Sequence, residues 1–355
     1  SGVSPAGVVA YNCSRLSGFG DRAGVHAAGW ARGPVRARPG RNATTAPIRR
    51  VRGGEGVSRI LVHEVGPRDG LQVEASTVPT EKKLEWLRSL VGCGLDLVQV
   101  GSFVRADKVP QMADTDALFR TLSQEPHRAV LSGLVLNEKG LERGLEVGVE
   151  LFCMGVSASE THSRKNTGMT TGEAQGRIVA MAKSALQAGK SVQVSVQSAF
   201  GCGFEGPISE ERVLGIVRAY LEAGLRNISL ADTAGHANPE QVERLFQSLF
   251  RLDRSIQATC HFHDTYGLGM ANIQAAMRCG VTCFETSFAG LGGCPFTKVA
   301  AGNVATEDLV HALQRMGRRD DIDLGSLIGT ARDVAAFFAR ELPGRVYKTG
   351  AIAIS

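Results

Sequence analysis

Two histidines one residue apart, His261 and His263, stand at the end of an apolar run in the segment CHFHD. Side chains of a β-strand alternate between two faces, so residues two apart point the same way. Both imidazoles can therefore bind one metal ion. The alternative for this pair alone is a polar strand end with hydrogen-bonded rings, and other motifs must decide between the two readings.

Two further residues can complete a metal site with oxygen atoms. Asp69 lies in the segment GPRDGLQ, directly after an apolar run, and Asn303 follows a glycine-rich segment. A carboxylate, an amide oxygen and two imidazoles suit octahedral Mg²⁺ or Mn²⁺ and leave positions open for water or a bidentate substrate. Closed zinc sites usually draw on cysteine. We therefore predict Mg²⁺ or Mn²⁺, with Co²⁺ and Zn²⁺ as alternatives.

Arg68 and Cys294 are candidates for a part in the reaction itself. Arg68 offers a planar guanidinium suited to a carboxylate, a carbonyl or a developing enolate, although an Arg-Asp pair in a turn is often only solvated. Cys294 lies in the glycine-rich segment SFAGLGGCPFTKVAAGN, residues 287–303. Such a loop can close over a site that excludes water, with the thiol as proton donor or redox-sensitive gate. The alternative is a glycine-rich connection with a chance cysteine.

Short apolar runs alternate with helical segments from residue 60 onward. This alternation is typical of βα units around a parallel sheet, and eight strands favour an α/β fold of the (β/α)₈ TIM barrel class, with a doubly wound open sheet as the alternative. The predicted strands are 60–65, 97–101, 129–135, 151–156, 191–197, 227–231, 257–262 and 283–286. The predicted helices are 81–92, 109–122, 138–147, 171–188, 210–223, 239–250, 268–278, 306–316 and 324–340.

The carboxyl ends of barrel strands meet at one rim, where barrel enzymes bind their substrates. Polar residues stand at the ends of the first, second, sixth and seventh predicted strands. Scattered charged loops explain any one of them but not their common position. We therefore expect substrate contacts from Arg68, Gln72, Gln99, Ser102, Asp232 and Thr233, beside the metal ligands Asp69, His261, His263 and Asn303.

The chain is predicted to hold one large domain with extensions. Residues 1–57 are rich in Arg, Gly, Ala, Ser and Pro and bury too little apolar surface to offset the entropy of ordering. We expect them to be a disordered extension. Residues 58–343 are expected to form the barrel with its C-terminal helical extension, and residues 344–355 a tail.

The net charge of +5 is concentrated in the first residues. Residues 1–57 contain nine Arg and two acidic residues, a charge of +7, which leaves −2 for the remainder. We therefore expect no nucleic-acid partner. We also expect no membrane association, since no apolar run approaches the roughly 18 residues of a membrane helix.

Eight cysteines without a C-x-x-C pair indicate a reducing compartment. We predict a cytoplasmic location, or the mitochondrial matrix if the Arg-rich start is a transit peptide.

Several motifs resemble those of the 3-hydroxy-3-methylglutaryl-CoA (HMG-CoA) lyases, members of the DRE-TIM metallolyase superfamily. The resemblance covers residues 60–343, and the cysteine-containing segment is specific rather than generic. The motifs are EVGPRDGLQ (64–72), GSFV (101–104), VPQMAD (109–114), SASETHSRKN (157–166), ISLADTAG (228–235), HFHDTYGLGMAN (261–272), SFAGLGGCPF (287–296), GN (302–303) and ATEDL (305–309).

The resemblance implies a metal-dependent retro-Claisen cleavage of HMG-CoA to acetyl-CoA and acetoacetate, a step of leucine degradation and ketone body metabolism. It places the catalytic arginine on Arg68, the loop cysteine on Cys294 and the metal ligands on the four residues named above. Asp69 or His261 would be the base. An acyl-CoA substrate and a homodimer are also implied.

Three positions depart from the family pattern. Gln99 stands where the family has a glutamate, Ala75 where many members have a lysine, and Gly203 where a proline is usual. Two alternatives follow. One is a sister lyase for a longer or differently branched 3-hydroxyacyl-CoA, and the other is a metal- or acyl-CoA-binding homologue with little turnover.

Overall fold

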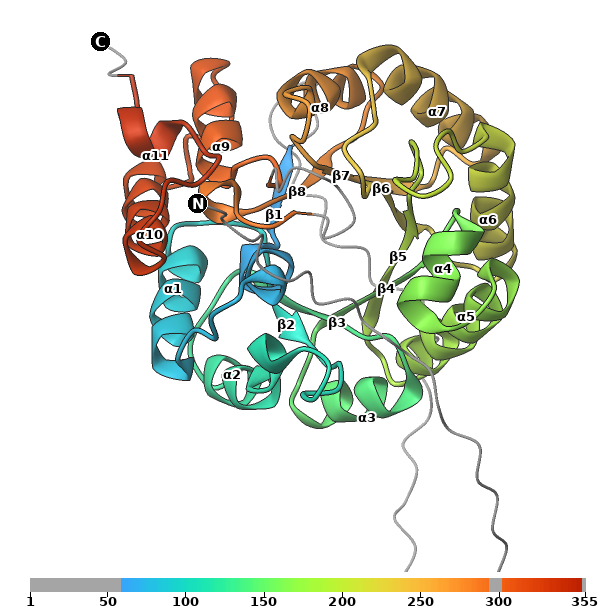
Figure 1. Ribbon diagram of the computed structural model, residues 1–355, viewed down its shortest axis with the longest axis horizontal. Helices are drawn as coiled ribbons and strands as arrows, with labels where there is room; N and C mark the ends of the chain where they lie inside the picture. Colours follow the sequence, from blue (N-terminus) through green and yellow to red (C-terminus); the bar gives the residue numbers. More distant parts are fainter. Residues whose placement is uncertain (1–58, 294–301, 353–355) are drawn as a thin grey trace, which may run out of the picture. The chain divides into compact units, whose positions relative to one another are not determined.

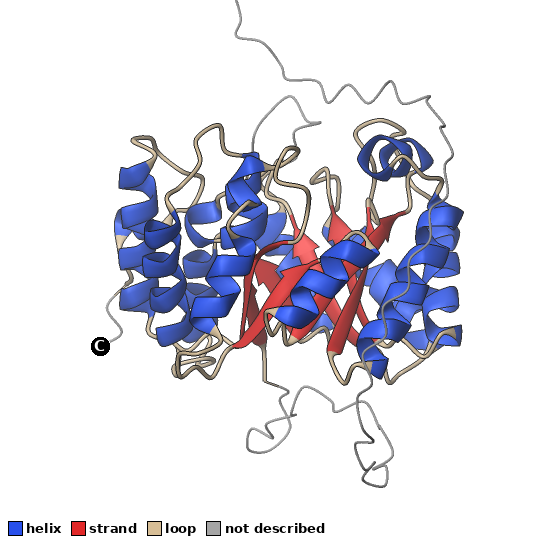
Figure 2. Ribbon diagram, turned by 90° about the horizontal axis from the view of Figure 1, so that it is seen from below, coloured by secondary structure: helices blue, strands red, loops and turns tan. Residues whose placement is uncertain are grey.

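The computed structural model describes residues 59–293 and 302–352. Eight strands form a closed barrel in chain order, and each is parallel to its neighbours. Helices surround the barrel (Figures 1 and 2). The predicted TIM barrel is therefore confirmed, and the open sheet is excluded because the first strand pairs with the last. The predictions for residues 1–57 and for Cys294 lie outside the described residues.

Every predicted strand is present, and its bounds differ by at most one residue from the prediction. The register between the second and third strands shifts between Gln99 and Gly101. The strands are β1 (Leu61–Glu64), β2 (Leu97–Ser102), β3 (Val130–Leu134), β4 (Leu151–Ser157), β5 (Ser191–Gln197), β6 (Asn227–Asp232), β7 (Gln257–Phe262) and β8 (Cys283–Thr286).

The helices agree with the sequence less closely. The helix predicted for 109–122 is instead a 3₁₀ turn followed by a helix, and two further short helices, α4 and α11, were not predicted. The α-helices are α1 (Thr80–Gly92), α2 (Thr115–Leu122), α3 (Glu138–Glu146), α4 (Glu160–Thr167), α5 (Thr171–Gln187), α6 (Glu210–Glu222), α7 (Pro239–Leu252), α8 (Gly269–Arg278), α9 (Thr306–Arg315), α10 (Leu324–Phe337) and α11 (Val346–Thr349). The single turns are η1 (Gly66–Gly70, a π-turn), η2 (Leu71–Val73), η3 (Pro110–Met112) and η4 (Phe288–Gly290).

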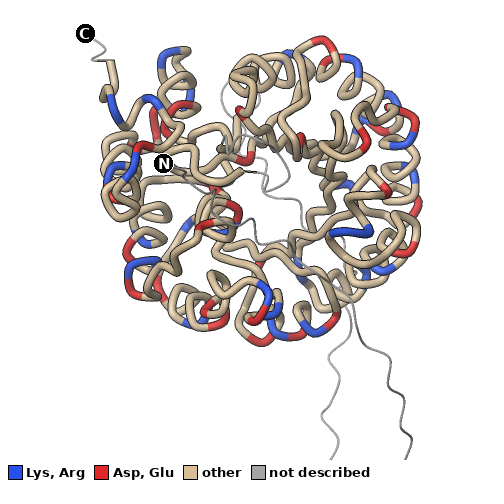
Figure 3. The backbone as a smooth tube through the Cα atoms, viewed as in Figure 1, with Lys and Arg blue, Asp and Glu red and all other residues tan. Residues whose placement is uncertain are grey.

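The outer helices pack on the barrel through apolar stripes. In α7 the buried residues are Val242, Leu245, Phe246 and Leu249, the spacing that puts side chains on one face of a helix. Asn238 caps this helix by accepting a hydrogen bond from the backbone N–H of Gln241, and Pro239 follows at a position where no helical N–H is lost. Lys, Arg, Asp and Glu are interspersed around the outer helices (Figure 3).

Helix α10 extends the barrel by packing beside α1 (Figure 1). Trp86 of α1 meets Phe337 edge to face, with ring centroids 5.5 Å apart. Ser89 and Thr330 share a hydrogen bond of 2.6 Å between their hydroxyls. The predicted C-terminal helical extension is therefore part of the packed domain.

Two buried carboxylates attach the chain after β8 to β1. Glu64 accepts hydrogen bonds from the backbone N–H groups of Gly66 (2.7 Å) and Phe288 (3.0 Å) and from the Thr306 hydroxyl (2.6 Å). Glu307 accepts one from the N–H of Ala289 (3.0 Å), a residue with a φ of 53°. Burial raises the pKa of Glu64 to about 7 and that of Glu307 to about 8. Two carboxyl groups thus fix turn η4, Glu64 through the N–H of Phe288 and Glu307 through the N–H of Ala289.

We predict that Glu307→Gln flattens the dependence of stability on pH. Between the ordinary carboxyl pKa near 4.5 and about 8, the folded protein keeps a proton that the unfolded chain has lost, so the free energy of unfolding falls as pH rises through this range. The variant should lose less stability than the wild type between pH 5 and 8, by ~2 kcal/mol or more. Urea denaturation at both pH values measures this, with the exposed Glu341→Gln as control. Equal slopes for Glu307→Gln and wild type would contradict the prediction.

Candidate metal centre and active site

Three predicted ligands converge at the carboxyl-terminal rim of the barrel. One ligand atom from each of Asp69, His261 and His263 lies within 4.8 Å of the others. The Nε2 atoms of the two histidines are 3.0 Å apart, and Nε2 of His261 is 3.8 Å from Oδ2 of Asp69. Both histidines are 6% exposed. Two nitrogens and a carboxylate that face one another at this depth form a suitable site for a divalent cation.

Asn303 lies beside this cluster and offers a fourth ligand atom. Its backbone forms an antiparallel bridge with His263. Its side-chain N–H groups donate to Oδ2 of Asp69 (2.9 Å) and to the carbonyl of Leu291 (3.1 Å). Its Oδ1 is buried and accepts no hydrogen bond from the described residues. An unpaired buried oxygen is costly unless something binds it, so the donor set fits a cation.

Local backbone geometry brings Asp69 and Asn303 close together. Pro67 lies in the first turn of η1, which follows β1 and carries Asp69 toward the rim. Gly292 has a φ of +109°, and a Cβ on it would lie 2.6 Å from Nδ2 of Asn303. A glycine is required there because any side chain would both strain the backbone and displace Asn303.

Arg68, Gln72 and Gln99 surround Asp69. The Arg68 guanidinium donates to Oδ1 of Asp69 and, through Nε, to Oε1 of Gln99. Gln72 donates to the same Asp69 oxygen over 3.3 Å. The predicted Arg68 is therefore a half-buried cation fixed between a carboxylate and an amide, and not a solvated turn residue.

The electrostatics of the cluster keep Asp69 and His263 in the protonation states that bind a metal. Burial would raise the pKa of Asp69, but the charge of Arg68, the two histidines and the hydrogen bond from Asn303 hold it far below its usual range. Burial and, to a lesser extent, the nearby His261 lower the pKa of His263 to about 4. Asp69 is thus anionic and His263 neutral at pH 7, as metal ligands must be.

His261 differs from His263 because the buried carboxylate of Glu285 contacts its Nδ1, the nitrogen that faces away from Asp69. Nδ1 of His261 is 3.0 Å from Oε2 of Glu285 on β8. Burial lowers the pKa of His261, but the bond to Glu285 and the charge of Asp69 outweigh it, so the pKa is raised. Sequence reasoning did not identify Glu285. The one available signal was its position two residues after Cys283 in a predicted strand. This position predicts the face of the strand on which Glu285 lies, but it does not predict which residues Glu285 contacts.

The other predicted site residues have separate roles in the described structure. Asp232 accepts hydrogen bonds from the backbone N–H groups of His236 (2.8 Å) and Ala237 (3.1 Å), and burial raises its pKa to about 7. Thr233 accepts one from the N–H of Ser198 (2.8 Å). The Ser102 hydroxyl is buried and has no partner among the described residues. Their substrate contacts stay predictions.

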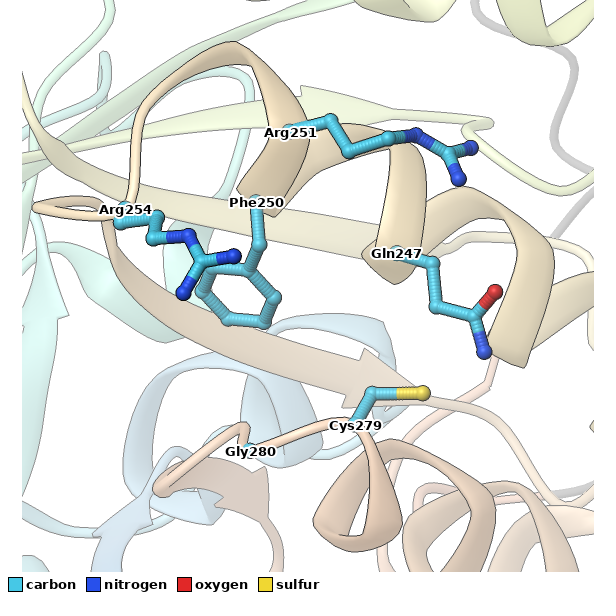
Figure 4. Close-up of a pocket in the computed structure, with 6 residues that line it drawn as sticks. All are labelled: Gln247, Phe250, Arg251, Arg254, Cys279 and Gly280. Carbon is cyan, nitrogen blue, oxygen red and sulfur yellow. The ribbon is translucent and has the colours of Figure 1, made fainter.

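A depression of about 690 Å³ lies at the opposite end of the strands from the metal cluster. It is formed where α7 and α8 end, and its lining includes Gln247, Phe250, Arg251, Arg254 and Cys279 (Figure 4). Cations at helix C-termini are an ordinary feature because they complement the helix dipole. The predicted site residues lie at the other rim, so this depression is not the candidate active site. No helix in the described ranges is long and apolar enough to cross a membrane.

Comparison with known proteins gives consistent matches over most of the chain. The HMGL-like family model matches residues 59–334. The hydroxymethylglutaryl-CoA lyase YngG of Bacillus subtilis is 36% identical over 287 residues, which cover 81% of this chain and 96% of that protein. The (R)-citramalyl-CoA lyase of Chloroflexus aurantiacus is 34% identical over 302 residues, covering 82% and 95%.

A solved structure is similar to the same extent. It is an HMG-CoA lyase from Acinetobacter baumannii in complex with coenzyme A and 3-methylmalate, 37% identical, with a TM-score of 0.78. The match covers 84% of this chain and 98% of that one. The family model, which matches residues 59–334, spans all eight strands and ends within α10.

We predict that Asp69→Ala and His263→Ala each weaken Mn²⁺ binding by more than about 100-fold, because each removes a ligand and not merely a residue that orients one. Electron paramagnetic resonance of free Mn²⁺ during titration measures the affinity. His311→Ala is the matched control, since this histidine lies away from the cluster and accepts a hydrogen bond from Ile352. Full metal stoichiometry and activity in either variant would refute the ligand assignment.

Proposed function

The chain belongs to the HMGL-like family, and from that premise we propose that it is a divalent-metal-dependent carbon-carbon lyase that cleaves HMG-CoA to acetyl-CoA and acetoacetate. The observation that carries this proposal is the cluster of Asp69, His261 and His263, with Oδ1 of Asn303 unpaired beside it and Arg68 adjacent. A carboxylate, neutral imidazole and amide oxygen supply the ligands, and a guanidinium supplies a fixed positive charge. A reaction that forms an enolate needs both the metal site and the positive charge of the guanidinium.

Asp69, His261, His263 and Asn303 would hold the cation, which would supply Lewis-acid chemistry at the substrate's tertiary hydroxyl and so lower the pKa of that hydroxyl. Mg²⁺ or Mn²⁺ is proposed because two of the four ligand atoms are oxygens. The described cluster contains no cysteine, which argues against a closed structural zinc site.

The protein groups perform the proton and charge steps. A base removes the proton of the tertiary hydroxyl. Asp69 and His261 were the two predicted candidates, and Asp69 is the one proposed here, because the nitrogens of His261 face the metal position and Glu285. The alkoxide electrons form the ketone of acetoacetate while the adjacent C–C bond breaks, and its electron pair becomes the enolate of acetyl-CoA. Arg68 stabilises the enolate oxygen with its fixed N–H groups. Protonation of the enolate carbon by Cys294 or by water completes the reaction.

Arg68 is suited to this task because its position is fixed before substrate binds. Its guanidinium is held by Asp69 on one side and Gln99 on the other. A donor that need not reorganise during the reaction stabilises developing charge more effectively than one that must. Gln72 and Gln99 are proposed to act mainly through this arrangement.

A sister lyase is the second candidate, and one observation favours it. The relative that cleaves (R)-citramalyl-CoA is nearly as similar to this chain as the hydroxymethylglutaryl-CoA lyase of B. subtilis. The same retro-Claisen chemistry thus serves more than one acyl group at this level of identity. Gln99 in place of the family glutamate is in keeping with a changed acyl group.

Acyl-CoA is the proposed substrate class in either case, since the matched A. baumannii structure holds coenzyme A. The homodimer, the cytoplasmic location and its mitochondrial alternative stay predictions.

The test of the proposed reaction is product release by metal-stripped protein before and after addition of Mg²⁺ or Mn²⁺. We expect acetyl-CoA and acetoacetate from HMG-CoA only with metal. Cleavage of citramalyl-CoA or a longer 3-hydroxyacyl-CoA, without cleavage of HMG-CoA, would favour the sister lyase. Bound metal with no product from any of these substrates would favour a binding homologue with little turnover.

We further predict that Gln99→Glu raises kcat for HMG-CoA. A charged acceptor holds Arg68 more firmly than an amide does. We expect the better fixed guanidinium to stabilise the developing enolate and to lower the activation barrier by about 1 kcal/mol, roughly fivefold in rate. Steady-state kinetics with saturating Mn²⁺ measures this, and Gln187→Glu on the exposed face of α5 is the control. No change, or a loss, would count against Gln99 as a weakened family site and would favour a specialised substrate.

A further inference from the structure

The interior of the barrel below the metal cluster contains an unusual layer of polar side chains. The lowest inward layer is apolar, with Leu61, Leu97, Val130 and Leu151 in one packed cluster. The residues two positions beyond Leu61, Leu97, Val130 and Cys283 face the same way, and all four are polar and buried: His63, Gln99, Ser132 and Glu285. Two further buried polar side chains, Gln193 and Thr259, share a hydrogen bond of 3.1 Å. Barrel interiors are usually filled by branched apolar residues, so this layer calls for a functional explanation.

Glu285 stands in the middle of a row across three adjacent strands. It is the register partner of His63 on β1 and of His261 on β7. Its Oε2 is 3.0 Å from Nδ1 of His261, and its Oε1 is 3.9 Å from Nδ1 of His63. Glu285 is 8% exposed. A carboxylate this deeply buried persists only where other groups compensate its charge.

His63 continues the row away from the metal cluster. It is fully buried, and its Nε2 is 2.7 Å from the Ser132 hydroxyl. Its Nδ1 forms no hydrogen bond with the described residues and faces Glu285. Ser132, His63, Glu285 and His261 therefore form a continuous path from β3 to the candidate metal ligand.

This path bears on which nitrogen of His261 faces the cluster. With Nδ1 against the Glu285 carboxylate, Nε2 points to Asp69 and His263. An imidazole whose Nδ1–H donates to a carboxylate carries its lone pair on Nε2, the atom that a metal ligand must present. If the ring of His261 were turned over, Nδ1 would no longer contact Glu285 and Nε2 would no longer face Asp69 and His263.

We propose that Glu285 is a positioning residue that fixes the ring orientation and tautomer of His261, and that His63, anchored by Ser132, holds Glu285 in place from the barrel interior. The proposal deepens the proposed function, on which it rests for the metal, by adding two side chains to the metal centre that bind neither metal nor substrate. Residues in such positions commonly change metal affinity about 10- to 100-fold.

The experiment is Mn²⁺ titration of the full chain, read by the resonance of free Mn²⁺, together with thermal melting. Glu285→Gln should weaken Mn²⁺ binding about 10- to 100-fold with little change in melting temperature. Ser229→Ala is the matched control, because Ser229 is a buried polar side chain on β6 whose hydroxyl has no partner among the described residues. It should bind Mn²⁺ as the wild type does.

His63→Leu tests the second half of the path. It should weaken Mn²⁺ binding in the wild-type background and have little effect in the Glu285→Gln background, since both act on one contact. Additive effects in the double variant would overturn the role of His63.

Glu285→Asp is the second variant, to be used if Glu285→Gln does not fold. Glu285→Asp keeps the charge but shortens the side chain by one methylene, which breaks the 3.0 Å contact with His261, so a loss of affinity is again expected. Mn²⁺ affinity within twofold of wild type in the folded variant would overturn the proposal. Wild-type protein that binds Mn²⁺ but cleaves no acyl-CoA would refute the proposed reaction and leave this inference intact, and wild-type protein that binds no Mn²⁺ would overturn both.

Discussion

The pairing of β1 with β8 is the contact on which the site depends. It places Leu61 opposite Cys283 and Glu64 opposite Thr286, and so joins parts of the chain more than 200 residues apart. Asp69 follows β1, while Glu285 and Asn303 belong to β8 and the chain after it. Their meeting therefore requires the barrel to close. An open sheet of the same strands would leave Asp69 far from His261 and would carry no metal site.

Closure also accounts for the buried charges around the site. Asp69 is compensated by Arg68 and the histidines, Glu285 by His261, His63 and Arg68, and Glu64 by three hydrogen-bond donors. Each of these groups would be expensive to bury alone. Arg68, Asp69, His261 and Glu285 form one connected network, in which the removal of a single member leaves another buried group unpaired. Glu64 is satisfied separately, by hydrogen bonds to the chain after β1 and β8.

Much of this was predictable because apolar runs and helical periodicity alternate clearly in the sequence, so that strands such as 191–197 and 257–262 were placed correctly. Helix α4 was missed because its sequence, ETHSRKNT, has no apolar stripe. It is defined instead by the cap of Ser159 and by Gly168 at a φ of 76°. His261 and His263 were predicted as ligands from their spacing together with the other motifs, and the structure brings both close to Asp69. Glu285 and His63 were not, since their contact with each other and with His261 depends on strand register, which sequence spacing does not reveal.

The contact between Gln99 and Arg68 gives this glutamine a role beyond the loss of an acidic group. Arg68 is shared between Asp69 and Gln99, and the pKa of Glu285 is lowered in part by the charge of Arg68. A glutamate at position 99 would add a third carboxylate around one guanidinium and would reduce the positive potential that an anionic substrate and an enolate encounter. The neutral amide keeps that potential higher but holds Arg68 by a weaker bond. Attraction for the anion and rigidity of the donor therefore oppose each other at this position, and the acyl group that the chain cleaves determines which of the two matters more.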